Sequence, residues 1–117
     1  SLCTNPCRCG AAAVLCLPAL IVGVSAASAH QASAGWRYPP ACCHNSDCST
    51  IPGRAVTEGN GGWSIDLLPG DHPRVTHRNR YFVPYGSEIP SQDREFHICL
   101  HPTEEQENCF FVPPGST

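Results

Sequence analysis

The sequence predicts a small all-β domain, an antiparallel sheet or open barrel stapled by about two disulfides, behind an N-terminal signal segment. Three observations predict it. The 117 residues include nine cysteines, and 12 prolines and 10 glycines punctuate the chain. Two segments alternate apolar and polar residues with the period of two that is typical of half-buried strands. After residue 30 no window shows the 3.6-residue period of a helix, so we expect almost no helix.

The first element is an apolar run over residues 11–24, which follows a basic residue and precedes small residues. This order is typical of a secretory signal, and the 14 residues fall short of the roughly 20 that a bilayer-spanning helix needs. We therefore predict a signal peptide over residues 1–29, with cleavage after Ala34 as the alternative. Residues 30–117 then form one domain with no membrane span.

Export would place the remaining cysteines in an oxidising compartment, where disulfides form by default. Removal of residues 1–29 leaves 88 residues with five cysteines, which are Cys42, Cys43, Cys48, Cys99 and Cys109. A core of this size leaves a thin margin of stability, and each bridge adds roughly 2–4 kcal/mol. The sequence thus predicts a periplasmic or secreted protein with two bridges and one leftover thiol.

The alternating segments are the clearest strand predictions. Residues 63–67 place Trp63, Ile65 and Leu67 on one face. Residues 96–101 place Phe96, Ile98 and Leu100 on one face, and on the other face, which we expect to be wet or bridged, His97, Cys99 and His101.

Turn residues predict how these strands connect. Residues 58–62 contain Asn-Gly and Gly-Gly, which supply the positive φ of tight turns, so residues 55–57 and 63–67 form a hairpin. Further strands are predicted at residues 74–76, 80–83 and 109–112.

The strand prediction suggests a first bridge. If residues 96–101 and 109–112 are antiparallel neighbours, Cys99 lies opposite Cys109, at a Cα separation of about 4.5 Å that a disulfide can span. The intervening loop would then carry a solvated acidic tip rather than a cation site, with Glu104, Glu105 and Glu107.

The second bridge is predicted within the cluster at residues 42–48. The simplest arrangement is a turn in which Cys48 pairs with Cys42 or Cys43, and the other cysteine is bridged elsewhere or free. Cross-bridging from this cluster to Cys99 or Cys109 stays open.

Six histidines raise the alternative of copper or zinc binding, since both metals take imidazole or thiolate ligands. His44 beside the cysteine cluster is the strongest candidate, and His72 or His77 could join it. His97 and His101 cannot both bind one ion from a straight strand, because roughly 13 Å separates them.

Two more metal ligands depend on local context. His97 lies near Cys99, which is also the predicted bridge residue. If the signal ends at Ala29, His30 becomes the N-terminus, where an amine and an imidazole together can chelate copper. Otherwise we expect no cofactor.

Charge and motif content argue against two function classes. The net charge is −3 and all seven basic residues are scattered arginines, so no basic face exists for nucleic acid. The mature chain has no C-x-x-C, G-x-S-x-G, H-E-x-x-H or phosphate-binding glycine loop, so we expect no enzyme.

The cysteine pattern and its aromatic neighbours resemble a group of small exported bacterial proteins. The resemblance is carried by WRYPPACC at residues 36–43, Asp47-Cys48, FHIC at residues 96–99 and CFF at residues 109–111. It covers most of the mature chain. It implies a bacterial periplasmic or secreted protein, and it implies no activity.

We therefore predict an exported binding or structural component of the cell envelope or exterior, with a protein or small molecule as partner. Copper or zinc binding near Cys42, Cys43 and Cys48 is the alternative. Tyrosine and tryptophan favour interfaces, so the candidates for a partner surface, which core packing explains equally well, are Trp36, Tyr38, Tyr81, Tyr85 and Phe111.

Overall fold

The computed structural model describes residues 31–32 and 35–116. The predicted signal peptide, both predicted cleavage sites and His30 lie outside these residues. Within them the prediction of an all-β fold is confirmed, because the chain forms two sheets and only one short 3-10 turn, Gly53–Ala55. No helix in the described part of the chain is long and apolar enough to cross a membrane.

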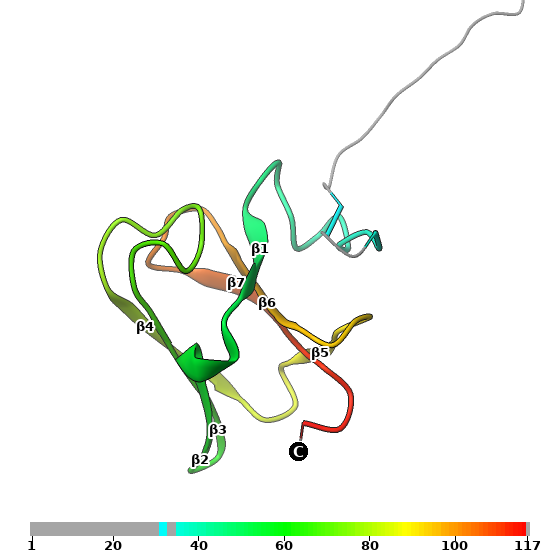
Figure 1. Ribbon diagram of the computed structural model, residues 1–117, viewed down its shortest axis with the longest axis vertical. Helices are drawn as coiled ribbons and strands as arrows, with labels where there is room; N and C mark the ends of the chain where they lie inside the picture. Colours follow the sequence, from blue (N-terminus) through cyan, green and yellow to red (C-terminus); the bar gives the residue numbers. More distant parts are fainter. Residues whose placement is uncertain (1–30, 33–34, 117) are drawn as a thin grey trace, which may run out of the picture.

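Seven strands make the two sheets (Figure 1). The four-stranded sheet has the order β1 (Cys48–Ile51), β6 (Phe96–Leu100), β7 (Glu107–Val112) and β5 (Ile89–Pro90). The three-stranded sheet has the order β2 (Val56–Gly59), β3 (Gly62–Leu67) and β4 (Asn79–Pro84). Pairing is antiparallel except between β5 and β7, which run parallel.

The predicted hairpin is confirmed as β2 and β3. Asn60 and Gly61 at its tip have φ values of 52° and 89°, the left-handed backbone that the Asn-Gly pair was expected to supply. Gly62 is required for a different reason, since a Cβ there would lie 2.4 Å from the carbonyl oxygen of Val83. The absence of a side chain lets β4 pair closely with β3.

The main core lies between the two sheets. From β3 it takes the face predicted by alternation, and Trp63, Ile65 and Leu67 are all at most 1% exposed. The four-stranded sheet contributes the facing side chains, which are Ile51, Ile98, Leu100, Phe110 and Val112. Both alternating segments therefore form strands with the predicted inward faces.

The opposite face of the four-stranded sheet is covered by the N-terminal segment, of which the structure describes residues 31–32 and 35–47 (Figure 1). Tyr38 packs there against Phe111 of β7, and a second cluster of buried residues surrounds the pair: Ala32, Cys42, Cys43, Cys48 and Cys99. The face of β6 that we expected to be wet or bridged is thus bridged and dry, with His97 and Cys99 fully buried.

The predicted disulfide between Cys99 and Cys109 is wrong, although the strand register behind it is right. Cys99 does lie opposite Cys109 in the β6–β7 pair. Cys99 also lies opposite Cys48 of β1, to which it is bonded, and Cys109 is bonded to Cys42 of the N-terminal segment. The predicted turn bridge within residues 42–48 is likewise absent, and the leftover thiol is Cys43, which is buried.

The predicted strand at residues 74–76 is also wrong. Its backbone groups bond to side chains and to a turn instead of to a neighbouring strand. The amide of Arg74 donates to Nδ1 of His72, the amide of Val75 donates to the carbonyl of His72, and the amide of Thr76 donates to Glu104.

Candidate functional site

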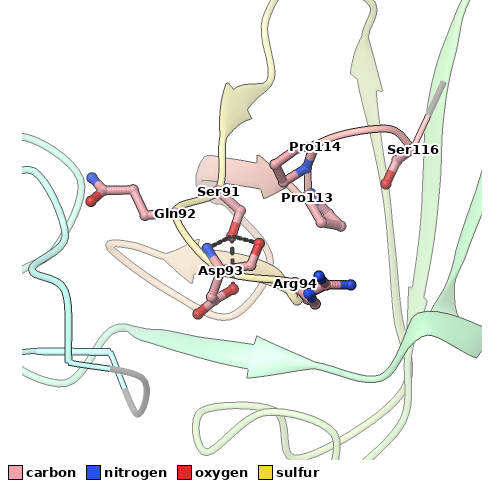
Figure 2. Close-up of a pocket in the computed structure, with 7 residues that line it drawn as sticks. All are labelled: Ser91, Gln92, Asp93, Arg94, Pro113, Pro114 and Ser116. Atoms are coloured by element: carbon pink, nitrogen blue, oxygen red, sulfur yellow. Dashed lines mark hydrogen bonds between the residues drawn. The ribbon is translucent and has the colours of Figure 1, made fainter.

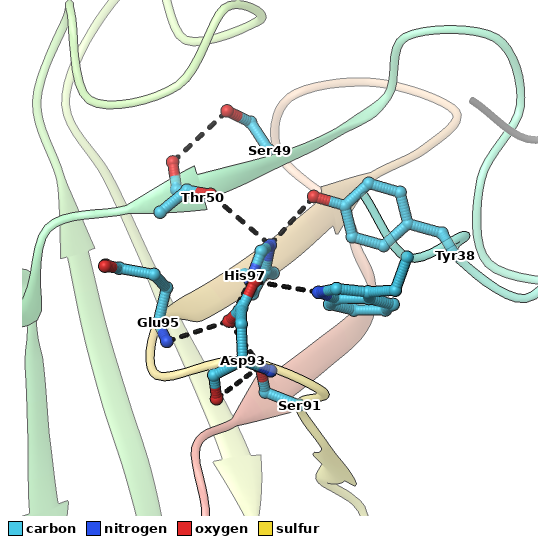
Figure 3. Close-up of polar contacts among 8 residues, drawn as sticks. Tyr38, Ser49, Thr50, Ser91, Asp93, Glu95 and His97 are labelled. Atoms are coloured by element: carbon cyan, nitrogen blue, oxygen red, sulfur yellow. Dashed lines mark hydrogen bonds and ion pairs between the residues drawn. The ribbon is translucent and has the colours of Figure 1, made fainter. Parts of the chain in front are cut away.

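A chain of buried polar side chains crosses the interface between the N-terminal segment and the four-stranded sheet (Figure 3). Nδ1 of His97 lies 2.8 Å from the Tyr38 hydroxyl, and Nε2 of His97 lies 2.9 Å from a carboxylate oxygen of Asp93. Because the ionised Asp93 only accepts, Nε2 of His97 donates to it, while Nδ1 pairs with the Tyr38 hydroxyl. Both ring nitrogens of His97 therefore have a hydrogen-bond partner.

Asp93 is the centre of this network. Besides His97, its carboxylate accepts hydrogen bonds from the Trp36 indole at 2.8 Å, from the Ser91 hydroxyl at 2.8 Å and from the amide of Glu95 at 2.8 Å. Partial burial opposes ionisation, but these donors outweigh it and hold the pKa of Asp93 well below its usual range.

This Tyr-His-Asp chain has the residue types of a proton relay, but it is closed to a substrate. Tyr38 is 1% exposed and His97 is fully buried, and burial raises the pKa of the Tyr38 phenol far above its usual value. What the geometry does is hold the N-terminal segment, through Trp36 and Tyr38, onto β6.

An open pocket of about 690 Å³ lies beside the network, and Asp93 belongs to both (Figure 2). Figure 2 shows the segment after β7, with Pro113 and Pro114, facing the loop that carries Ser91, Asp93 and Arg94. The floor of this pocket is rigid because the Asp93 carboxylate is held by four donors.

Arg94 supplies the positive charge of this pocket. Its side chain is exposed, and no ion pair to it is found within the described part of the chain. A guanidinium is the side chain best suited to bind a carboxylate or phosphate through two parallel hydrogen bonds. The pocket can therefore accept an anionic group at its mouth and an apolar group against the prolines.

The residues that the sequence suggests as metal ligands near the cysteine cluster make other contacts in the structure. His44 is exposed and stacks on His101, with ring centroids 4.0 Å apart. His101 contacts Asp47 at 3.1 Å, and His97 is engaged in the buried network. Cys42 and Cys48 are in disulfides, so they offer no thiolate. His30 lies outside the described residues.

His72 does not join this cluster as a ligand. It is 2% exposed, and it donates through Nε2 to the carbonyl of Ile98 and accepts the amide of Arg74 at Nδ1. Burial lowers the pKa of His72, against the weaker opposing effect of its hydrogen bond to Ile98. His72 is thus a neutral core residue.

One group of three metal-binding side chains does converge within the described residues, and it lies elsewhere. It consists of His77, Glu104 and Glu105, whose donor atoms all lie within 4.8 Å of one another. The sequence predicts His77 only as a ligand that could join His44. The glutamates were expected to form a solvated tip, yet the Glu104 side chain is only 14% exposed, and Glu107 is half-buried in β7.

The predicted aromatic partner surface is largely core. Tyr38 and Phe111 are 1% exposed and Tyr81 is 8% exposed, whereas Tyr85 is 44% exposed. Trp36 is half-buried against Tyr38 and donates to Asp93. Packing therefore accounts for most of these rings.

Comparisons with protein-family models, with curated proteins and with solved structures find no match for this chain.

Proposed function

We propose that this chain is an exported binding domain, periplasmic or secreted, that holds a ligand bearing a carboxylate in the pocket between residues 91–94 and 113–116. The two disulfides support export, because such bonds persist in oxidising compartments. The resemblance of the cysteine pattern to small exported bacterial proteins supports a bacterial source.

The observation that carries the proposal is the placement of Arg94 at a pocket with a rigid floor. Asp93 is committed to four internal donors, so it does not compete for the guanidinium of Arg94. Pro113 and Pro114 add an apolar wall with little conformational entropy to lose. A fixed pocket with one available cation suits recognition of an anion better than it suits catalysis.

The test is an NMR titration of the disulfide-bonded, ¹⁵N-labelled protein with N-acetylglycine and, separately, with N-acetylglycinamide. These probes differ only in the carboxylate. We expect saturable shifts of the amides of residues 91–95 and 115–116 with the acid alone. Arg94→Gln should abolish them, whereas Arg80→Gln, an exposed arginine of β4, should leave them intact.

Two results would overturn the proposal. One is the absence of any saturable shift at residues 91–95 with the acid. The other is an equal response to the acid and the amide, which would show that the pocket does not select the anionic group.

Copper or zinc binding beside Cys42, Cys43 and Cys48 stays a prediction that needs donors beyond those the structure brings together there. Only the Cys43 thiol is not bridged, and it is buried, with Sγ 3.1 Å from the carbonyl of Asn45. A contribution from His30 lies outside the described residues.

A further inference from the structure

His77 and two glutamates meet where the segment before β4 approaches the loop between β6 and β7. Nε2 of His77 lies 3.1 Å from a carboxylate oxygen of Glu105 and 3.8 Å from one of Glu104. Glu104 and Glu105 follow His77 by 27 and 28 residues in the sequence, so the fold brings the three side chains together.

The ring orientation of His77 shows what the group lacks. Nδ1 lies 3.2 Å from the carbonyl oxygen of Arg78, which can only accept, so Nδ1 carries the ring proton of the neutral imidazole. Nε2 then faces two carboxylates that also only accept, so a cation must lie between the three groups. The Arg78 carbonyl and the two carboxylates raise the pKa of His77, so the second ring proton is one such cation. A metal ion that displaces this proton is another.

This orientation is the one in which proteins present histidine to metals. A metal-bound imidazole commonly donates its other N–H to a backbone carbonyl or carboxylate, which fixes the tautomer and aims the free nitrogen. The carbonyl of Arg78 fills that role for His77.

Glu104 is held in place by groups that leave one of its oxygens facing His77. Oε1 accepts the amide of Thr76 at 2.7 Å and the Asn79 side chain at 2.9 Å. Oε2 accepts the Thr76 hydroxyl and faces His77. These hydrogen bonds, with the Thr76 hydroxyl as the largest contributor, lower the pKa of Glu104 to about 2, so the carboxylate is ionised at any physiological pH.

The spacing suits a small divalent ion. Bond lengths of 2.0–2.2 Å in a tetrahedral zinc site place neighbouring ligand atoms about 3.3 Å apart. The two distances from Nε2 of His77 lie within about half an ångström of that value. Glu105 is 56% exposed, so its side chain can adjust without disturbing the core.

No arginine neutralises the two carboxylates. Within the described residues, the ion pairs of Glu104 and Glu105 are with His77 alone. Arg78 pairs with Asp66, and Arg74 contacts Asp47 and the carbonyl of Pro102. Among these residues the two carboxylates therefore meet no fixed positive charge, and a metal ion would take the place of the proton that His77 shares with them.

We propose that His77, Glu104 and Glu105 form a binding site for a divalent first-row transition cation of the zinc type. Nε2 of His77 and one oxygen of each glutamate are the protein ligands. The exposed side of the site leaves further coordination positions to water, the arrangement of a reversible or reactive metal site rather than of a closed structural one.

The experiment is a calorimetric titration of the purified, disulfide-bonded protein with ZnCl₂ above neutral pH, followed by NMR of the histidine ring nitrogens. We expect binding of one zinc per chain and a large shift of Nε2 of His77. His77→Ala removes an exposed imidazole and Glu105→Gln an exposed negative charge, and each should weaken zinc binding about tenfold or more.

Matched variants separate this site from others on the chain. His44→Ala and Glu95→Gln remove an exposed histidine and an exposed glutamate elsewhere, and both should leave zinc affinity unchanged. Zinc binding only at millimolar concentration would overturn the proposal. So would zinc affinity that survives His77→Ala, or a His77 ring that responds to pH but not to zinc, which would identify an ion pair only.

Discussion

The two faces of the four-stranded sheet are buried by different means. One face packs against β3 and β4 and consists of apolar side chains such as Ile98, Leu100 and Phe110. The other lies under the N-terminal segment and carries two disulfides, a buried histidine and an ionised aspartate. The first face is stabilised by apolar area removed from water, whereas the second needs covalent bonds and matched hydrogen bonds.

The difference follows from what each covering layer can offer. A paired sheet satisfies its own backbone groups and presents a regular apolar surface. The N-terminal segment has few backbone partners, so it is attached by side chains: the Cys42–Cys109 disulfide, the Trp36 and Tyr38 hydrogen bonds, and the amide of Asn108, which donates to the carbonyl of Cys42.

The largest effect is expected on the apolar face. Phe110 is fully buried and stacks on Phe96, with Trp63 close by. Phe110→Ala should reduce the free energy of unfolding by about 3–5 kcal/mol in urea denaturation. Phe82→Ala, which removes a ring that is 53% exposed, should cost under about 1 kcal/mol. Similar losses from both variants would mean that the face between the sheets is not the main core.

A smaller loss is expected when the covalent attachment of the N-terminal segment is removed. The double variant Cys42→Ala with Cys109→Ala opens a link that spans 67 residues of sequence, and it should lose roughly 2–4 kcal/mol. It should also expose the Cys43 thiol to alkylation under native conditions, because Cys43 belongs to this segment and is buried between it and the four-stranded sheet. Unchanged alkylation of Cys43 would show that the other contacts suffice to hold the segment.

The hydrogen bonds of the Tyr38-His97-Asp93 network should contribute less to the free energy of unfolding than the disulfide does. Asp93→Asn replaces an acceptor of four hydrogen bonds by a group that also donates, so one donor loses its partner, at a cost of about 1–3 kcal/mol. Asp66→Asn is the matched control, because Asp66 forms exposed ion pairs that solvent screens, so its loss should change stability much less. Equal shifts of the urea midpoint in the two variants would show that Asp93 stabilises the fold no more than an exposed aspartate does.

The smallest effect is a pH dependence from His72, which joins the turn before β4 to the carbonyl of Ile98. Burial lowers the pKa of His72 in the folded protein, and Asp47 and Arg74 are the nearby charges. The unfolded chain therefore binds a proton first, and stability should fall as pH decreases below the unfolded histidine pKa of about 6.5. His72→Gln should flatten this part of the stability profile, and an unchanged slope would contradict the assignment.

Alternation predicted the apolar face well and the polar face poorly, for a physical reason. Burial in β3 follows from large apolar side chains at every second position, Trp63, Ile65 and Leu67, so it can be read from the sequence. His97 is buried because the N-terminal segment covers it, a contact between residues 59 positions apart that no local pattern encodes. The four residues of β1 lack alternation, and β5 is a two-residue strand.

The disulfides and the group of His77, Glu104 and Glu105 also depend on contacts between residues that are distant in the sequence. The register placed Cys99 opposite Cys109, but β6 also pairs with β1, and the positions of Cys48 on β1 and Cys42 before it decide which sulfurs meet. His77 lies just before β4 of the three-stranded sheet, whereas Glu104 lies between β6 and β7 of the four-stranded sheet. The many histidines and the acidic loop could be read from the sequence, but the contact between them could not.

Non-reducing peptide mapping by mass spectrometry tests most directly the claim that the polar face is closed covalently by the N-terminal segment. The account predicts two linked peptide pairs, Cys42 with Cys109 and Cys48 with Cys99, and alkylation of Cys43 only after unfolding. A linked pair of Cys99 with Cys109, or a bridge within residues 42–48, would contradict it.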